Sequence, residues 1–235
     1  MIWTKNQIIG CRFENSLNSA DGEQFTANGT ISYGDGFFGK ELDLTSSGSF
    51  VELGGINTIG NKIDGAKAIT ISMFVTPTTL SPSRQDILYI PNYFPTNRGA
   101  GLIFGIRNNT SFDIRGRSRG ISTSNNVNEN LSVSNVFSVS IRHHLVGIFD
   151  FENKELVAYV NGVEVGIADN LGWLDDEYSH SATGGSGQAA CLGADANLAG
   201  SNKFTGFVDE FQVWRTRLSE SDIKRIYHGL HPLNG

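Results

Sequence analysis

The feature that most constrains this chain is a two-residue spacing of apolar side chains, repeated in short runs along most of the sequence. The runs end at Gly, Asn, Ser or Pro, which is typical of β-strands. In the run at 68–76, alternation merges with a continuous apolar stretch, which predicts a central strand. Numerous strands with short connections favour two packed antiparallel sheets. Strands are predicted at residues 7–13, 41–45, 49–53, 68–76, 86–90, 102–107, 111–117, 137–142, 144–150, 155–160, 163–168, 189–193 and 204–214.

Composition supports a single all-β domain over residues 1–235. Glycine occurs 28 times, which indicates frequent turns, and 39% hydrophobic residues can fill a core. Only residues 218–227 are predicted to be helical, with Ser219 as the N-cap and apolar side chains on one face. Gly229 follows as a stop signal, so a short helix should close the chain.

The charge pattern excludes several classes of protein. With 18 basic and 24 acidic side chains the net charge is −6, and the bases are scattered, so we expect neither nucleic acid nor a membrane as partner. The opening residues lack the pattern of a signal peptide, and we expect the mature chain to begin at Met1. Cys11 and Cys191 are interpreted as core residues, with a disulfide between them as the alternative.

Two polar segments, 120–135 and 170–188, are longer than the roughly twelve residues usual for loops in compact domains. Such loops are either functional or disordered. The second holds Trp173 and Tyr178.

The C-terminal half carries a recognisable series of motifs. The segment HHLVGIFDFENKELVAYVNGVEVG predicts two strands joined by a tight turn at Asn161-Gly162, and FTGFVDEFQVWRTRLSESDIKRIY follows forty residues later. Together they resemble the C-terminal half of a laminin G-like, or concanavalin A-like, jelly-roll domain. The matching residues are His144, Val146, Tyr159, Val160, Asn161, Gly162, Phe204, Gly206, Val208, Asp209, Glu210, Trp214, Leu218, Ser219 and Ile223.

The N-terminal segment CRFENSLNSADGEQFTANGTISYGDGFFGKELDLTSSGSFVELG is similar to the opening of such domains, so the resemblance covers nearly the whole chain. Residues 80–135 match poorly. The N-terminal segment looks most like modules of phage tail and prophage structural proteins. The matching residues there are Phe13, Glu14, Leu17, Gly22, Gly29, Tyr33, Gly36, Phe38, Gly39, Lys40, Leu42, Leu44, Phe50, Val51 and Leu53.

The resemblance implies an antiparallel β-sandwich of the jelly-roll type, used as a non-catalytic lectin-like module that binds glycans on a virion or another extracellular surface. A structural tail module whose main partners are other virion proteins is the alternative, and a divergent glycan hydrolase or lyase is a third. Fold resemblance alone does not choose among them.

Several enzymes of this fold, such as laminarinase-type glycoside hydrolases, carry a Glu-x-Asp-x-x-Glu strand, and cleavage with retention needs its carboxyls about 5 Å apart. That spacing does not occur here; the nearest acidic groups are Asp150 with Glu152 and Glu155, the run 175–177, and Asp209-Glu210. His143 and His144, being adjacent on a strand, should point to opposite faces. We therefore expect no enzymatic activity.

By resemblance, a structural calcium ion is expected, with Asp209 as side-chain ligand and oxygens from Glu14 and Gly48 nearby. Carboxylate and carbonyl oxygens are the ligands that calcium prefers. The alternative is that Asp209 only caps hydrogen bonds of its strand.

The basic segment from Arg107 to Arg119 is the main candidate ligand contact. Arg115, Arg117 and Arg119 share one face of a predicted strand, and guanidinium groups suit carboxylates or sulfates. A solvated sheet face is the alternative. The aromatic residues least explained by core packing, which we expect to stack on sugar rings, are Tyr93, Phe94, Trp173 and Tyr178. Acidic glycans should accordingly be preferred.

Overall fold

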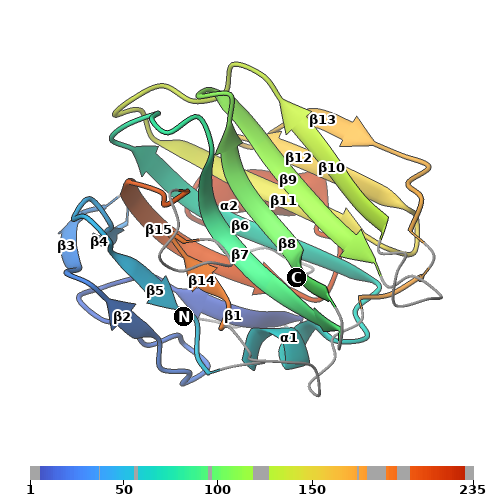
Figure 1. Cartoon of the computed structure of the whole chain (residues 1–235), viewed down its shortest axis with the longest axis horizontal. Coiled ribbons are helices and arrows are strands. Elements are labelled where there is room, and N and C mark those ends of the chain that lie inside the picture. The colour runs from blue at the N-terminus through green and yellow to red at the C-terminus, as the bar shows by residue number, and fades with distance from the viewer. Residues whose placement is uncertain are drawn as a thin grey trace.

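The computed structural model describes residues 6–36, 38–55, 58–94, 97–118, 127–173, 175–178, 189–194 and 202–230. Two antiparallel sheets lie face to face, as predicted (Figure 1). One has eight strands in the order β13-β12-β11-β6-β15-β4-β3, with β1 also paired to β15. These strands are β1 (Gln7–Cys11), β3 (Ser32–Asp35), β4 (Lys40–Asp43), β6 (Ala68–Pro77), β11 (His143–Asp150), β12 (Glu155–Val160), β13 (Val163–Ala168) and β15 (Gly206–Trp214).

The other sheet has seven strands in the order β10-β9-β8-β7-β14-β5-β2. They are β2 (Thr26–Asn28), β5 (Phe50–Glu52), β7 (Gln85–Phe94), β8 (Asn97–Arg107), β9 (Ser111–Ser118), β10 (Val127–Val133) and β14 (Cys191–Leu192). Two helices, α1 (Thr58–Ile63) and α2 (Glu220–Tyr227), complete the described elements.

The core lies between the sheets. β6 pairs with β11 on one side and β15 on the other, which confirms the predicted central strand. Two glycines allow large rings to reach into this layer: a Cβ at Gly147 would lie 2.5 Å from Phe104, and one at Gly116 would lie 2.6 Å from Trp173. Close packing of this kind tolerates little added volume.

Helix α2 covers the outer face of the eight-stranded sheet. Ser219 accepts a hydrogen bond from the Asp222 amide at 3.1 Å, which confirms the N-cap, and Ile223 and Ile226 pack with Trp214. The turn predicted at Asn161-Gly162 is also confirmed, since both residues have positive φ angles of 52° and 78°. Helix α1 packs against the core between the sheets, to which its buried side chains belong. The outer face of the seven-stranded sheet, nearest the viewer in Figure 1, carries charged side chains together with the buried residues Tyr89 and Ile103.

Some predicted elements are wrong. Residues 137–142 form a turn instead of a strand, because Ser140 has a positive φ of 61° and only Phe137 enters the core. The segment predicted as a long polar loop contains β10, an edge strand whose core contacts come from Leu131 and Val133. Helix α1 and the short strands β2 and β3 were not predicted either.

Cys11 and Cys191 are both buried, which confirms the core assignment, and no disulfide joins them. Among the described residues, the helices are too short and too polar to cross a bilayer.

Candidate functional site

Strand β9 alternates between core and surface. Phe112 and Ile114 enter the core, so Asp113, Arg115 and Arg117 point to the outer face of the seven-stranded sheet. Ile103 on β8 pairs with Arg115, and Tyr89 on β7 pairs with Ile103, so these residues share that face. Asn128 and Asn130 on β10 pair with Arg117 and Arg115 and are both exposed.

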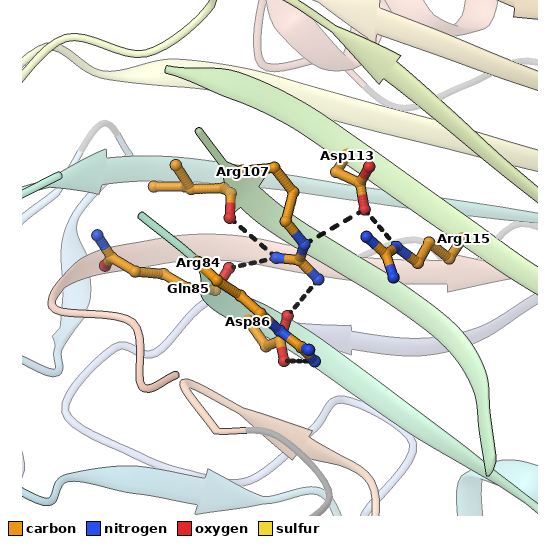
Figure 2. Close-up of polar contacts among 7 residues, drawn as sticks. Arg84, Gln85, Asp86, Arg107, Asp113 and Arg115 are labelled. Carbon is orange, nitrogen blue, oxygen red and sulfur yellow. Dashed lines mark hydrogen bonds and ion pairs between the residues drawn. The ribbon is translucent and has the colours of Figure 1, made fainter. Parts of the chain in front are cut away.

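A row of ion pairs crosses this face from β7 to β9 (Figure 2). Asp86 is bound by Arg84 at 2.9 Å and by Arg107 at 2.7 Å. Asp113 is bound by Arg115 at 2.7 Å, and its Oδ2 lies 3.6 Å from Arg107 Nε. Three guanidinium groups thus share two carboxylates.

Arg107 is the buried centre of the row, with a side chain only 9% exposed. Its guanidinium folds over Gly105, where a Cβ would collide with Nη1, and donates hydrogen bonds to the carbonyls of Gln85 and Ile106 at 3.2 and 2.9 Å. The prediction of Arg107 as a ligand contact is corrected on this ground: protein acceptors occupy its donors, and little of it reaches the surface.

Arg117 differs from the other arginines of the face. It is half-buried, and it makes no hydrogen bond or ion pair with the residues that the structure describes. Burial lowers the pKa of Arg117, opposed by a weaker interaction with Tyr89. Arg115 is 31% exposed and already paired with Asp113. Arg119 lies outside the described residues.

Trp173 and Tyr178 are core residues, so the prediction that they are free to stack on sugars is wrong. They are 3% and 0% exposed, and their rings lie 4.6 and 5.8 Å from the ring of Phe151. The space above Gly116 receives Trp173, and burial raises the pKa of Tyr178. The side chains of Tyr93 and Phe94 lie outside the described residues.

The expected calcium ligands fit in part. Asp209 and Glu14 both reach the turn between Gly36 and Gly39: a Cβ at Gly36 would lie 2.7 Å from Asp209 Oδ2, and one at Gly39 would collide with Glu14 Oε1. Two carboxylates thus converge on a turn that glycine keeps open.

The Gly48 carbonyl, in contrast, accepts a hydrogen bond from the Lys203 ammonium at 3.0 Å, which does not suit a cation ligand. Within the described residues, no group of three or more His, Cys, Asp or Glu side chains is arranged to hold a metal ion.

Glu210 neighbours these carboxylates on a bulge of β15 and has a positive φ of 48°. Burial raises its pKa to about 7; Arg12, whose Nε is 3.2 Å from Glu210 Oε1, lowers it, and Asp209 and Glu14 raise it. Sequence reasoning named Asp209-Glu210 only as a pair of acidic residues and missed the burial of Glu210.

The two histidines are packing residues on opposite faces, as predicted. His144 Nε2 lies 2.8 Å from Ser72 Oγ and its ring packs on Phe74 and Tyr227, while His143 packs on Phe137. Burial lowers the pKa of His144 to about 3, so it stays neutral.

A groove of about 700 Å³ lies where β6 begins and where β11 and β15 end. Its charged groups are satisfied by protein: Lys67 pairs with Glu152, Arg217 joins Asp150 to Glu155, and Arg215 donates to the Asp64 carbonyl. One predicted acidic group, formed by Asp150, Glu152 and Glu155, is therefore engaged in ion pairs.

Residues 48–224 match the family model described as the concanavalin A-like lectin/glucanases superfamily. The chain belongs to that superfamily. Its description names both lectins and glucanases, so membership alone does not decide whether a concanavalin A-like domain is catalytic. A comparison with curated proteins found no significant match.

Solved structures share the fold at low sequence identity. Domain 4 of AbnA, a GH43 extracellular arabinanase from Geobacillus stearothermophilus, solved in complex with arabinotriose, matches with a TM-score of 0.60 and 19% identity over 95% of this chain and 100% of that chain. The botulinum neurotoxin serotype C1 binding domain matches with a TM-score of 0.63 and 13% identity over 96% of this chain and 52% of that one.

A structure of botulinum neurotoxin type C, whose cell entry depends on two ganglioside molecules, gives a TM-score of 0.64 and 12% identity over 96% of this chain and 51% of that chain. The chain thus spans about half the length of the toxin chains that it matches. These likenesses show the concanavalin A-like fold.

Proposed function

We propose that this domain is a non-catalytic, lectin-like module that binds glycans on the outer face of its seven-stranded sheet. The observation that carries the proposal is that face itself, where the Arg84-Asp86-Arg107-Asp113-Arg115 row holds polar side chains in place beside Arg117, which has no ion pair among the described residues. Sugar hydroxyls need donors and acceptors in fixed positions, and side chains locked by ion pairs bind at low entropic cost.

The comparisons support a saccharide as ligand. Domain 4 of AbnA is covered completely and was solved with arabinotriose, and the related toxin structure concerns gangliosides. Support for a non-catalytic role comes from the missing Glu-x-Asp-x-x-Glu spacing and from Arg217, which neutralises Asp150 and Glu155. A virion or other extracellular location stays a prediction.

A glycan array with the intact chain, read with and without EDTA, tests the proposal. Binding to particular glycans is expected, and Lys224→Ala, on helix α2 at the opposite face, should bind equally well as a matched control. If no glycan on an array that includes neutral and acidic saccharides binds, the proposal is wrong, and a structural module with protein partners becomes the better account.

A further inference from the structure

We infer that Arg117 is a specificity-determining contact, and that it selects saccharides bearing a carboxylate. This inference rests on the proposed glycan-binding function and names its ligand class. Its starting point is the unequal distribution of carboxylates over the arginines of the face. Asp86 and Asp113 bind Arg84, Arg107 and Arg115, whereas Arg117 pairs with neither of them.

The state of the Arg117 side chain indicates a missing acceptor. A half-buried guanidinium loses hydration, and its Nε is fully buried with no hydrogen-bond acceptor among the described residues. A buried donor without an acceptor is rare and destabilising. A carboxylate would supply both the acceptor and the opposite charge, in the two-point geometry that guanidinium groups favour.

The neighbours of Arg117 suit the rest of a sugar. Continuing the register in which Leu102 pairs with Gly116 places Gly101 beside Arg117 on β8, so no side chain occupies that position. On the other side, Asn128 pairs with Arg117 and Asn130 with Arg115, and both amides are exposed. Paired residues have Cβ atoms about 5 Å apart on one face, and amides both donate to and accept from hydroxyls.

The net charge of −6 does not prevent this contact. At about 0.15 M salt, screening acts over roughly 8 Å, so the nearby guanidinium groups dominate the field at the site. A carboxylate bound at Arg117 would therefore meet a locally positive surface on an acidic protein.

Calorimetric titration tests the inference with uronate and sialate oligosaccharides and with the methyl esters of the same sugars. Losing a charge-assisted hydrogen bond costs about tenfold to a hundredfold in affinity. We expect Arg117→Gln to weaken binding of the acids by that factor and to leave the esters unchanged. Lys224→Gln, on helix α2 at the opposite face, is the matched control and should bind the acids as tightly as wild type does.

Each other outcome has a definite meaning. Equal binding of acids by Arg117→Gln and wild type overturns the inference but leaves glycan binding intact. Binding of esters but not acids overturns it in the same way. Failure to bind any saccharide refutes the proposed function as well.

A ligand-free measurement separates recognition from a structural role. Because Arg117 lacks a partner in the described chain, Arg117→Gln should melt at or above the wild-type temperature. A marked loss of melting temperature, matching that of a substitution at Arg107, would show that Arg117 stabilises the sheet and would overturn the inference.

Discussion

Replacing Arg107 should be the most destabilising change on the outer face of the seven-stranded sheet. Its side chain is 9% exposed and that of Asp86 is 0% exposed, with 2.7 Å between Nη2 and Oδ1. Removing one partner of a buried ion pair costs about 3–5 kcal/mol, because the other charge stays buried. The lower limit, about 3 kcal/mol, applies here because Arg84 and Arg115 still contact the two carboxylates.

The assay is urea and thermal unfolding of Arg107→Met, which keeps the aliphatic volume of the side chain. For a chain of this length, about 3 kcal/mol corresponds to a fall in melting temperature of roughly 6–12 °C. The control is Arg115→Met: its side chain is 31% exposed and it forms one ion pair, so we expect about 1 kcal/mol or less.

A double-mutant cycle shows whether the Asp86 contact is responsible. Asp86→Asn combined with Arg107→Met should cost less than the sum of the single changes, by about 0.5–3 kcal/mol. Equal losses for Arg107→Met and Arg115→Met, or strictly additive effects in the cycle, would refute the reasoning that burial makes Arg107 the centre of the row.

Three further predictions concern catalysis, calcium and pH. Incubation with a panel of oligosaccharides and polysaccharides should release no reducing or unsaturated ends; turnover that a single Asp or Glu substitution abolishes would contradict this. Calcium at a hundredfold excess over Kd should stabilise the fold by about 2.7 kcal/mol, and Asp209→Asn should remove the effect, since Asp209 and Glu14 converge on the Gly36 turn; an unchanged melting temperature in a chelator-stripped sample argues against the ion. The pKa of Glu210 rises from 4.5 to about 7 on folding, so the folded state retains a proton that the unfolded state loses. The stability that protonated Glu210 contributes is fully present below pH 4.5 and is lost as pH rises through 7. The free energy of unfolding changes by about 3 kcal/mol over this range. His144, with its pKa lowered to about 3, makes stability change with pH in the opposite direction. The measurement is therefore the difference in unfolding free energy between wild type and Glu210→Gln as a function of pH. A difference that does not change with pH would disprove the assignment.

The parts of the fold predicted from sequence are those that local interactions specify. The central strand at 68–76 is buried at nearly every position, because both of its faces and both of its edges are covered, and its apolar residues reflect this. The Asn161-Gly162 turn and the Ser219 N-cap depend on backbone angles and side-chain hydrogen bonds within a few residues. Such features do not require knowledge of the partner sheet.

The errors arise where burial is decided by distant segments. Trp173 stands in a polar stretch, and its core position follows from a contact with Gly116 that no local pattern reveals. Strand β10 is held by pairing with β9 on one edge and needs only alternate apolar residues, so its Asn and Ser side chains resemble a loop. The contact between Lys203 and the Gly48 carbonyl escaped prediction for the same reason, because Lys203 is 155 residues away in sequence.

Only part of the arginine row can be predicted from the periodicity of the sequence. Alternation placed Arg115 and Arg117 on one face, and Asp113, two residues before Arg115, shares it, so one ion pair was readable from the sequence. The burial of Arg107 could not be predicted from the sequence, because it depends on Asp86 from β7 and on the space that Gly105, which has no side chain, leaves open. Asp86 and Asp113 are already paired with the other arginines. Arg117, at the next outward position of β9, therefore has no counter-charge among the described residues of the sheet. The charge balance of three strands, and not the number of arginines in one of them, therefore singles out Arg117 as the arginine of this face without a counter-charge among the described residues.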